Sequence, residues 1–329
     1  SDLCRETAAG ARVEVPVFAS FMTGEPPAAR LVLRHRLHGW DRLGRTLSAP
    51  GGQRDIAFEP WLARELEPLQ LTMPDAPGLW VLALTLETPG GSVLHRNFTT
   101  FLVGGPSPRS ETSPASPGRA ATHIVRFAPA AFSAAEWSQK HWNVLDGAKV
   151  NGAGHGYFEY RLAWPEGLRA DALAGASLVC ELSAKQLFGK DRDGAVLADG
   201  DYMRGRGTHD PSANPNAYPM TDTVAFPSAV RVRLNGEVAA VVPLADDPAD
   251  HRGVLSWHAQ LRDRRLREAG SYGYLVQVPL PATALATAAS QGELILRLEV
   301  DAAVSGGLGI YGERFGRYPV EPAIVFERR

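Results

Sequence analysis

The sequence predicts an all-β protein. We expect an N-terminal immunoglobulin-like β-sandwich, joined by a Pro/Ser-rich linker to a larger jelly-roll-like β-sandwich with long loops and one or two short helices. Strand-like runs outnumber helical patterns along the 329 residues, and no strand–helix alternation indicates a parallel sheet. A content of 44% hydrophobic residues is enough to bury a sizeable core. We place the domains at residues 1–105 and 122–329, with the linker at residues 106–121.

The first domain is predicted from the alternation of apolar and charged residues. In residues 29–37, Leu31 and Leu33 alternate with Arg34 and Arg36, which is typical of a half-buried antiparallel strand. Pro-Gly-Gly turns separate several of the strand-like runs. About seven such strands within about 95 residues match an immunoglobulin-like sandwich. The other runs with this character are 13–18, 56–58, 69–72, 79–86 and 93–103.

The linker and the second domain differ sharply in composition. Residues 104–121 contain four Pro and four Ser but no aromatic residue, so they cannot bury enough apolar surface to offset their ordering entropy. The second domain shows helical patterns at residues 256–269 and in a short turn after Pro281. Many strands with long loops between them favour a jelly-roll double sheet. Its strand-like runs are 123–127, 157–164, 176–182, 230–234, 238–244, 274–280, 293–300 and 323–327.

The longest expected loop spans residues 181–223. It is rich in Gly, Pro, Asp and Asn, and it follows neither the helical nor the strand period. A loop of this length inside a compact domain either binds something or is disordered, and its aromatic and basic residues favour an ordered binding loop. The alternative is a surface excursion that packs on its own aromatic residues.

Charge and cysteine usage exclude several classes of partner. The chain has 34 basic and 36 acidic residues, and a net charge of −2 provides no field that would gather nucleic acid or an anionic membrane. No apolar run reaches the length of a membrane span. Cys4 and Cys180 lack the spacing of a zinc site, and Cys180 is expected to be a buried structural thiol. The chain begins without Met, as a processed protein or a fragment would.

Aromatic and polar residues of the second domain have the chemistry that binds a sugar. A sugar ring has an apolar face, which an aromatic ring can cover, and a belt of hydroxyls, which amides, carboxylates and Arg can bind. Trp137 and Trp142 lie in the segment AEWSQKHWNVLDG, five positions apart, and the alternative is that one of them packs in the core. The carbohydrate-binding candidates are Trp137, Trp142, Tyr202, Arg204, His209, Asn214, Asn216 and Tyr218.

Four aspartates in the long loop are candidate calcium ligands. Hard cations take carboxylate and carbonyl oxygens from irregular loops, although this stretch lacks the Glu that completes an EF-hand loop. The alternative is a set of solvated turn aspartates. These residues are Asp191, Asp193, Asp199 and Asp201.

Long phrases of the sequence resemble the C-terminal part of family 2 glycoside hydrolases, the β-galactosidase, β-mannosidase and β-glucuronidase-like enzymes. They include VLHRNFTTFLV, KHWNVLDGAKVNGAGHGYFEYRLAWPEGL, DYMRGRGTHDPSANPNAYPMTD and GGLGIYGERFGRYPVEPAIVF. In that family the two catalytic glutamates belong to a (β/α)8 barrel of about 250 residues, for which this chain has no room. The acid/base glutamate of the family follows an Asn, and no Asn-Glu pair occurs here.

The resemblance therefore implies a non-catalytic, ancillary role with no catalytic residue in this chain. The implied partners are an oligo- or polysaccharide and a catalytic (β/α)8 domain of the same parent protein, in a periplasmic or extracellular setting. Two alternatives stay open. One is a jelly-roll polysaccharide lyase that uses Tyr202, His209, Arg204 and Arg206. The other is a structural spacer that packs on the missing catalytic domain.

Overall fold

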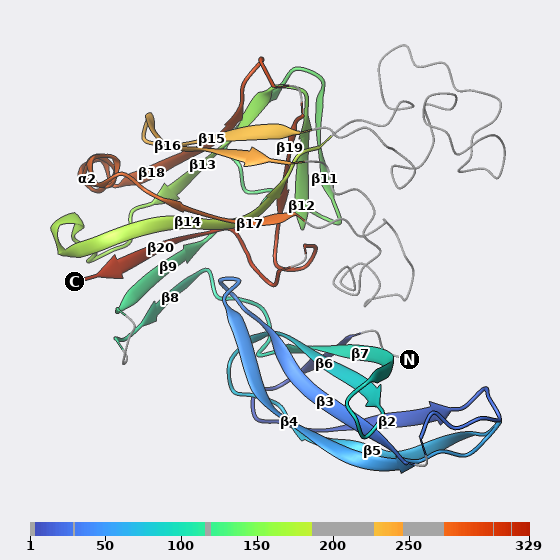
Figure 1. Cartoon of the computed structure of the whole chain (residues 1–329). Helices are drawn as coiled ribbons and strands as arrows, with labels where there is room; N and C mark the ends of the chain where they lie inside the picture. The colour runs from blue at the N-terminus through green and yellow to red at the C-terminus, as the bar shows by residue number, and fades with distance from the viewer. Residues whose placement is uncertain are drawn as a thin grey trace, which may run out of the picture. The chain divides into compact units, whose positions relative to one another are not determined.

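The computed structural model describes residues 4–28, 30–115, 120–185, 227–245, 273–304, 306–316 and 318–329. The chain divides into two compact units, Ser1–Pro106 (unit 1) and Ser107–Arg329 (unit 2), which we treat separately (Figure 1). Strands form both units, with one α-helix in the described part of unit 2. This confirms the predicted all-β class.

Unit 1 is a two-layer sandwich. A five-stranded sheet has the order β1-β7-β6-β3-β4, and a two-stranded sheet pairs β2 with β5. The first strand, β1, runs parallel to β7, whereas the other pairs are antiparallel. The strands are β1 (Cys4–Thr7), β2 (Arg12–Ser20), β3 (Arg30–Asp41), β4 (Thr46–Ala57), β5 (Ala63–Thr72), β6 (Gly78–Glu87) and β7 (Val93–Val103).

The core of unit 1 lies between these two sheets. The predicted alternation in β3 is confirmed, because Leu31 and Leu33 are buried whereas Arg36 is exposed. Trp80 and Phe101, on neighbouring strands, fill the centre with 1% and 0% of their surface exposed. The Trp80 indole N–H donates a hydrogen bond to the Ala76 carbonyl at 3.0 Å, so the one polar group of this buried side chain has a partner.

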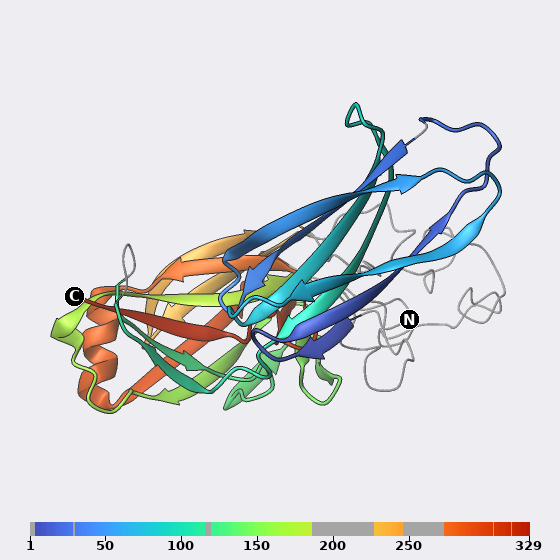
Figure 2. The ribbon, with the colours of Figure 1, turned by 90° about the horizontal axis from the view of Figure 1, so that it is seen from below.

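Unit 2 is a second sandwich, drawn in Figure 1 and, turned by 90°, in Figure 2. An eight-stranded sheet has the order β11-β12-β19-β14-β20-β9-β8, with β17 also paired to β14, and a five-stranded sheet has the order β10-β13-β18-β15-β16. The strands are β8 (Ser110–Ser113), β9 (Thr122–Arg126), β10 (Ala134–Trp137), β11 (Lys140–Val144), β12 (Lys149–Ala153), β13 (Gly156–Ala163), β14 (Leu173–Ser183), β15 (Ser228–Leu234), β16 (Glu237–Leu244), β17 (Tyr274–Pro279), β18 (Glu293–Val300), β19 (Leu308–Tyr311) and β20 (Ala323–Arg328).

One core cluster joins the two sheets of unit 2. Leu178 and Leu182 from β14 belong to it together with Phe158 of β13 and Leu296 of β18, and none of the four has any exposed surface. Cys180 is in the same cluster, which confirms that it is a buried thiol. Burial, and to a lesser extent the neighbouring carboxylate of Glu181, raise the pKa of this thiol, so it stays protonated and unreactive.

The helix predicted after Pro281 is confirmed as α2 (Ala282–Gln291). It begins after Pro281 and ends at Gly292, whose φ of 71° is the left-handed conformation that glycine adopts without strain. Ala284, Leu285 and Ala288 bury one side of it. The other predicted helix, at residues 256–269, lies outside the described residues. In the described part of the chain, no helix combines the length and hydropathy that a membrane crossing needs.

The predicted linker is partly wrong. We expected residues 106–121 to lack structure, but Ser110–Ser113 form β8, an edge strand paired antiparallel with β9. An edge strand needs no apolar side chains, because backbone hydrogen bonds to a single neighbour hold it. The nearly buried side chain of Arg126 also bonds the Pro108 carbonyl and the carboxylate of Glu111, both at 2.9 Å. Composition alone therefore missed a strand that backbone pairing stabilises.

Candidate functional site

One face of the large sheet of unit 2 is unusually polar. In β12, Val150 points into the core while Lys149 and Asn151 point to the opposite face, as a period of two requires. Residues directly opposite each other on antiparallel strands share a face, so the pairing registers place two polar rows side by side. One row is Trp142, Asn151, Gly309 and Ser183, and the other is Val144, Lys149, Tyr311 and Glu181. We call this surface the Asn151 face.

The polar members of this face are deeply buried. Lys149, Asn151, Glu181, Ser183 and Tyr311 each have 0% of their surface exposed. Trp142, which lies at the end of its row on the outer strand β11, is only partly buried. Burial of polar groups costs free energy unless each group finds a partner, so the contacts of these side chains decide what the face can do.

Three of these groups hold one another. The hydroxyls of Ser183 and Tyr311 are 3.0 Å apart and share a hydrogen bond. The Lys149 ammonium lies 4.5 Å from the ring centroid of Tyr311 and 5.3 Å from that of Phe315, within the range of cation–π attraction. The ammonium, two rings and a hydroxyl pair thus form one connected cluster on the sheet.

Glu181 uses its carboxylate to hold backbone. Its Oε1 accepts a hydrogen bond from the Gly273 N–H at 2.6 Å, and its Oε2 accepts one from the Tyr318 N–H at 2.9 Å. A Cβ atom at Gly316 would lie 2.1 Å from Oε2, so only glycine fits beside the carboxylate. These contacts give Glu181 a structural role, in which it ties two later segments of the chain to β14.

Asn151 differs from its neighbours. Neither its amide nitrogen nor its amide oxygen has a hydrogen-bond partner among the residues that the structure describes. Across the row, a Cβ atom at Gly309 would lie 3.2 Å from the Asn151 amide oxygen and 2.9 Å from the Ser183 hydroxyl. A larger residue at this position would therefore crowd both side chains. An unsatisfied buried amide costs about 1–3 kcal/mol, which marks this position as one that a ligand could satisfy.

The two tryptophans predicted to bind sugar lie on different sides of this sheet. Trp142 is on the Asn151 face, where the Lys140 ammonium lies 5.8 Å from its ring. Trp137 lies against the backbone of Gly152 and packs on the core, with its ring 5.1 Å from that of Phe158. Of the pair, Trp142 is therefore the one placed to meet a ligand on this face.

The remaining predicted site residues lie outside the described residues. They are the carbohydrate-binding candidates Tyr202, Arg204, His209, Asn214, Asn216 and Tyr218, the additional lyase candidate Arg206, and the calcium-ligand candidates Asp191, Asp193, Asp199 and Asp201. In the part of unit 2 and unit 1 that is described, no three His, Cys, Asp or Glu side chains gather as a metal site would require.

The described ends of the long loop lie close to the Asn151 face. The Lys185 N–H donates to the Gly306 carbonyl at 2.6 Å, and the Ser228 hydroxyl donates to the Gly307 carbonyl at 2.7 Å. Gly307 is two residues from Gly309 of the row that contains Asn151. Both described ends of this loop are thus bonded to the residues that lead into β19, although the chain leaves from β14 of one sheet and enters β15 of the other.

Sequence reasoning missed most of the Asn151 face. Lys149, Asn151, Glu181, Ser183 and Tyr311 were not candidates, although a signal was present. In KVNGA and in the end of ASLVCELS, polar residues occupy alternate positions between apolar ones, which indicates a polar face on a strand that is otherwise apolar.

Comparisons with known proteins give matches among solved structures, whereas no protein-family model and no curated protein sequence matches the chain. The M60 catalytic domain with the CBM51-1 and CBM51-2 domains from Clostridium perfringens ZmpB is 7% identical at a TM-score of 0.27, covering 96% of this chain and 34% of that one. The tandem CBM22-1-CBM22-2 domain from Paenibacillus barcinonensis Xyn10C is 11% identical at 0.25, covering 97% and 79%. A calcium-binding mutant of Bacteroides uniformis beta-glucuronidase 2 is 10% identical at 0.20, covering 99% and 29%. With every TM-score this low, the likeness carries no argument about function.

Proposed function

We propose that this chain is a non-catalytic, carbohydrate-binding region of a glycoside hydrolase, and that it takes a saccharide on the Asn151 face. The observation that carries the proposal is the Asn151 amide, which is fully buried and has no partner among the described residues, in one row with the partly exposed ring of Trp142. The resemblance of the sequence to the C-terminal part of family 2 glycoside hydrolases also supports it.

The chemistry of this row suits a sugar. The indole of Trp142 offers an apolar surface for the C–H face of a pyranose ring. An amide supplies both donors and an acceptor, so Asn151 can bind a hydroxyl that is itself both donor and acceptor. Satisfying this amide would remove the cost of its burial, and that gain would appear as affinity.

The same face supports binding rather than hydrolysis. Glycoside hydrolysis needs two carboxyl groups that flank the scissile bond, one of them free to transfer a proton. The Glu181 carboxylate instead accepts two backbone N–H groups that anchor later segments of the fold. The lyase alternative depends on Tyr202, His209, Arg204 and Arg206, which lie outside the described residues.

A second candidate function is the structural spacer, which an apolar patch on unit 1 favours. Phe18, Met22 and Trp61 are 71%, 77% and 70% exposed. Phe18 and Met22 alternate along β2 and just beyond it, and Trp61 lies just before the paired strand β5. Exposed large apolar side chains at one end of a strand pair are a feature of surfaces that another domain covers.

Affinity electrophoresis through gels that contain one polysaccharide each tests the proposed function. We expect retardation by at least one polysaccharide, and Trp142→Ala should weaken that binding about tenfold, because an aromatic platform is lost. The matched control is Trp61→Ala, which removes an exposed indole from unit 1 and should leave retardation unchanged. Equal retardation of the Trp142→Ala variant and the parent would count against the Asn151 face.

Asn151→Leu gives a second test that separates binding from stability. Leucine has nearly the same shape but no hydrogen-bonding atoms, so the ligand-free protein should be as stable as the parent or more stable by about 1 kcal/mol. Saccharide binding should be lost. If urea unfolding instead shows a clear loss of stability while retardation persists, the amide serves the fold, through a buried water for example, and the proposal is wrong.

A further inference from the structure

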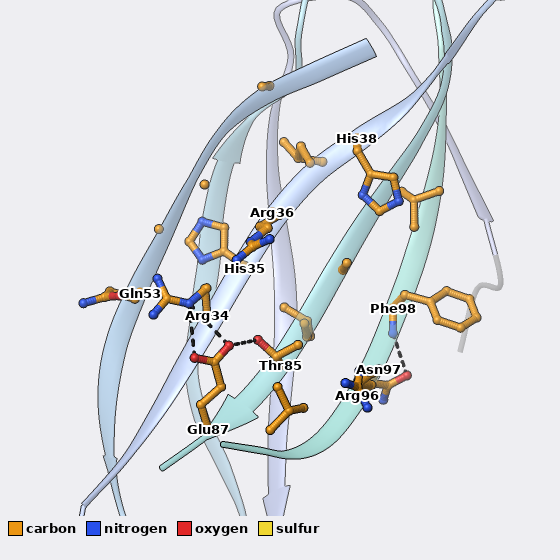
Figure 3. A pocket seen from close by; sticks show the side chains of 18 of the residues that line it. Arg34, His35, Arg36, His38, Gln53, Thr85, Glu87, Arg96, Asn97 and Phe98 are labelled. Carbon is orange, nitrogen blue, oxygen red and sulfur yellow. Dashed lines mark hydrogen bonds and ion pairs between the residues drawn. The ribbon is translucent and has the colours of Figure 1, made fainter. Parts of the chain in front are cut away.

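We propose that unit 1 carries a separate binding site for an anionic saccharide on the outer face of its five-stranded sheet. A basin of about 1070 Å³ lies over β4, β3, β6 and β7 (Figure 3). The choice of a saccharide over other carboxylates rests on the proposed function. The preference for an anion rests on the charges of the basin alone.

The register of the strands builds this basin. On β3, the residues that alternate with the buried Leu31, Leu33 and Leu37 face the other way. One row across the sheet is Arg34, Thr85 and Arg96, and the next is Arg36, Ala83 and Phe98. Thr85 and Ala83 of β6 thus form the floor of the basin. The longer side chains of Arg34 and Arg36 on β3 and of Arg96 and Phe98 on β7 line its two sides. The strands β3 and β7 lie two strand spacings apart, which is about 10 Å.

The charge of the basin is strongly unbalanced. Arg34, Arg36 and Arg96 line it, and Glu87 is the one acidic side chain among its lining residues. Arg34 is already paired with Glu87, with its Nε 3.3 Å from both carboxylate oxygens. Arg36 and Arg96 are exposed, and neither forms an ion pair with a carboxylate in the described part of the chain. Among the described residues, neither guanidinium group has a carboxylate within ion-pair distance, so both can bind an anion.

Glu87 is held mainly by Thr85 and Arg34, and the charge of Arg36 has the smallest effect on the pKa of its carboxyl group. The Thr85 hydroxyl donates to it at 2.6 Å, and this bond, together with Arg34, lowers the pKa of the carboxyl group despite an opposing effect of desolvation. The carboxylate is thus committed to Arg34 and Thr85 at the edge of the basin, as the dashed lines of Figure 3 show.

The rest of unit 1 does not share this excess of positive charge. Residues 1–106 contain ten arginines, no lysine and eleven acidic residues, so the unit as a whole is slightly negative. An extended polyanion such as nucleic acid would find no net attraction outside the basin, whereas a short anionic ligand would meet mainly the arginines. The local excess favours a ligand of a few residues over a long polyelectrolyte.

Apolar surface in the basin favours a sugar among small anions. Phe98 at the rim is 46% exposed, and Val81 and Ala83 add small apolar side chains to the floor. These groups suit the C–H face of a pyranose ring, while a guanidinium binds a carboxylate or sulfate through paired hydrogen bonds. One exposed ring, without a series of aromatic platforms, does not suit a run of stacked bases.

Titration calorimetry of the full chain with tetragalacturonate tests the inference, and its fully methyl-esterified form, which lacks the charge, is the matched ligand. We expect the acid form to bind at least about tenfold more tightly than the ester, with weaker binding at high salt. Arg36→Gln combined with Arg96→Gln should remove most of this preference. Arg12→Gln combined with Arg109→Gln makes the same change in charge at exposed positions outside the basin and should leave it intact.

Other outcomes would overturn the inference. Equal binding of acid and ester would exclude recognition of the anion. Equal affinity for tetraglutamate or an oligothymidylate of matched charge would exclude a saccharide site. Because Trp142→Ala leaves the basin untouched, it should retain tetragalacturonate binding, and loss of that binding in Trp142→Ala would place the acidic sugar on unit 2. These experiments therefore distinguish an error in the proposed site on unit 1 from an error in the proposed binding on the Asn151 face.

Discussion

At the scale of single residues, Glu321 shows how this fold changes the protonation of a side chain. The pKa of its carboxyl group is raised from 4.5 to about 7, mainly by burial and also by the nearby Glu313 carboxylate. The Glu313 N–H, which donates to it at 2.9 Å, and Arg126 oppose this shift without cancelling it. Below about pH 7 the protonated form of Glu321 therefore predominates in the folded protein.

This raised pKa predicts a loss of stability with rising pH. The folded-state pKa lies above the unfolded value of 4.5, so the stabilisation from protonation is complete below pH 4.5 and is lost as the pH rises through about 7. The loss is at most about 3 kcal/mol, because the side chain keeps some contact with water. Glu321→Gln should remove this component, so that urea unfolding at pH 5 and pH 8 gives a smaller difference than in the parent. An unchanged difference would show that other groups cause the pH dependence.

At the scale of elements, β8 is held to unit 2 by a nearly buried charge. The Arg126 side chain is 3% exposed and lies 2.9 Å from the Glu111 carboxylate of β8, which is 37% exposed. Removing one partner of such a pair leaves a charge that is poorly solvated. The edge strand and its neighbour are therefore coupled through side chains as well as through the backbone.

Glu111→Gln tests this coupling. We expect unit 2 to lose about 1–2 kcal/mol of stability, less than for a fully buried pair because water reaches Glu111. Asp171→Asn is the matched control, since its partner Arg169 and Asp171 itself are 77% and 66% exposed, and it should leave the urea transition in place. Equal shifts for the two variants would contradict a special role for Arg126.

The elements also show what local pattern can and cannot predict. The alternation of Leu31 and Leu33 with arginines predicted β3, and the helical pattern after Pro281 predicted α2, because both signals depend on neighbours in the chain. The strand β8 was missed because its Ser-Glu-Thr-Ser sequence has no apolar alternation. What makes it a strand is the partner β9, which composition does not reveal.

At the scale of the whole molecule, each unit has its own core. The core cluster of unit 1 draws on residues up to Val103, and that of unit 2 begins at Phe127. A core that is complete within one segment is the physical requirement for independent folding. We therefore expect each of the two units that meet after Pro106 to be stabilised by its own core.

Two fragments test where unit 2 begins. A fragment of residues 107–329 should fold cooperatively, whereas one of residues 122–329, the boundary expected from composition, should melt several degrees lower because it lacks β8 and the partner of Arg126. Circular dichroism melting curves give the comparison. Equal melting temperatures would mean that β8 adds no stability and that unit 2 can begin at residue 122.

The sequence by itself determined the all-β class and most strand positions in the described residues, because alternation and turns are local properties. It also placed Trp142 among the candidates, on its residue type alone. Only the tertiary structure decided that Trp142, Asn151 and Ser183 lie in one row, and that Trp137 packs on the core. The tertiary structure alone also showed that Arg36 and Arg96 line one basin. Strand pairing joins residues far apart in sequence, and which strands pair depends on burying one shared core, a property of the whole chain.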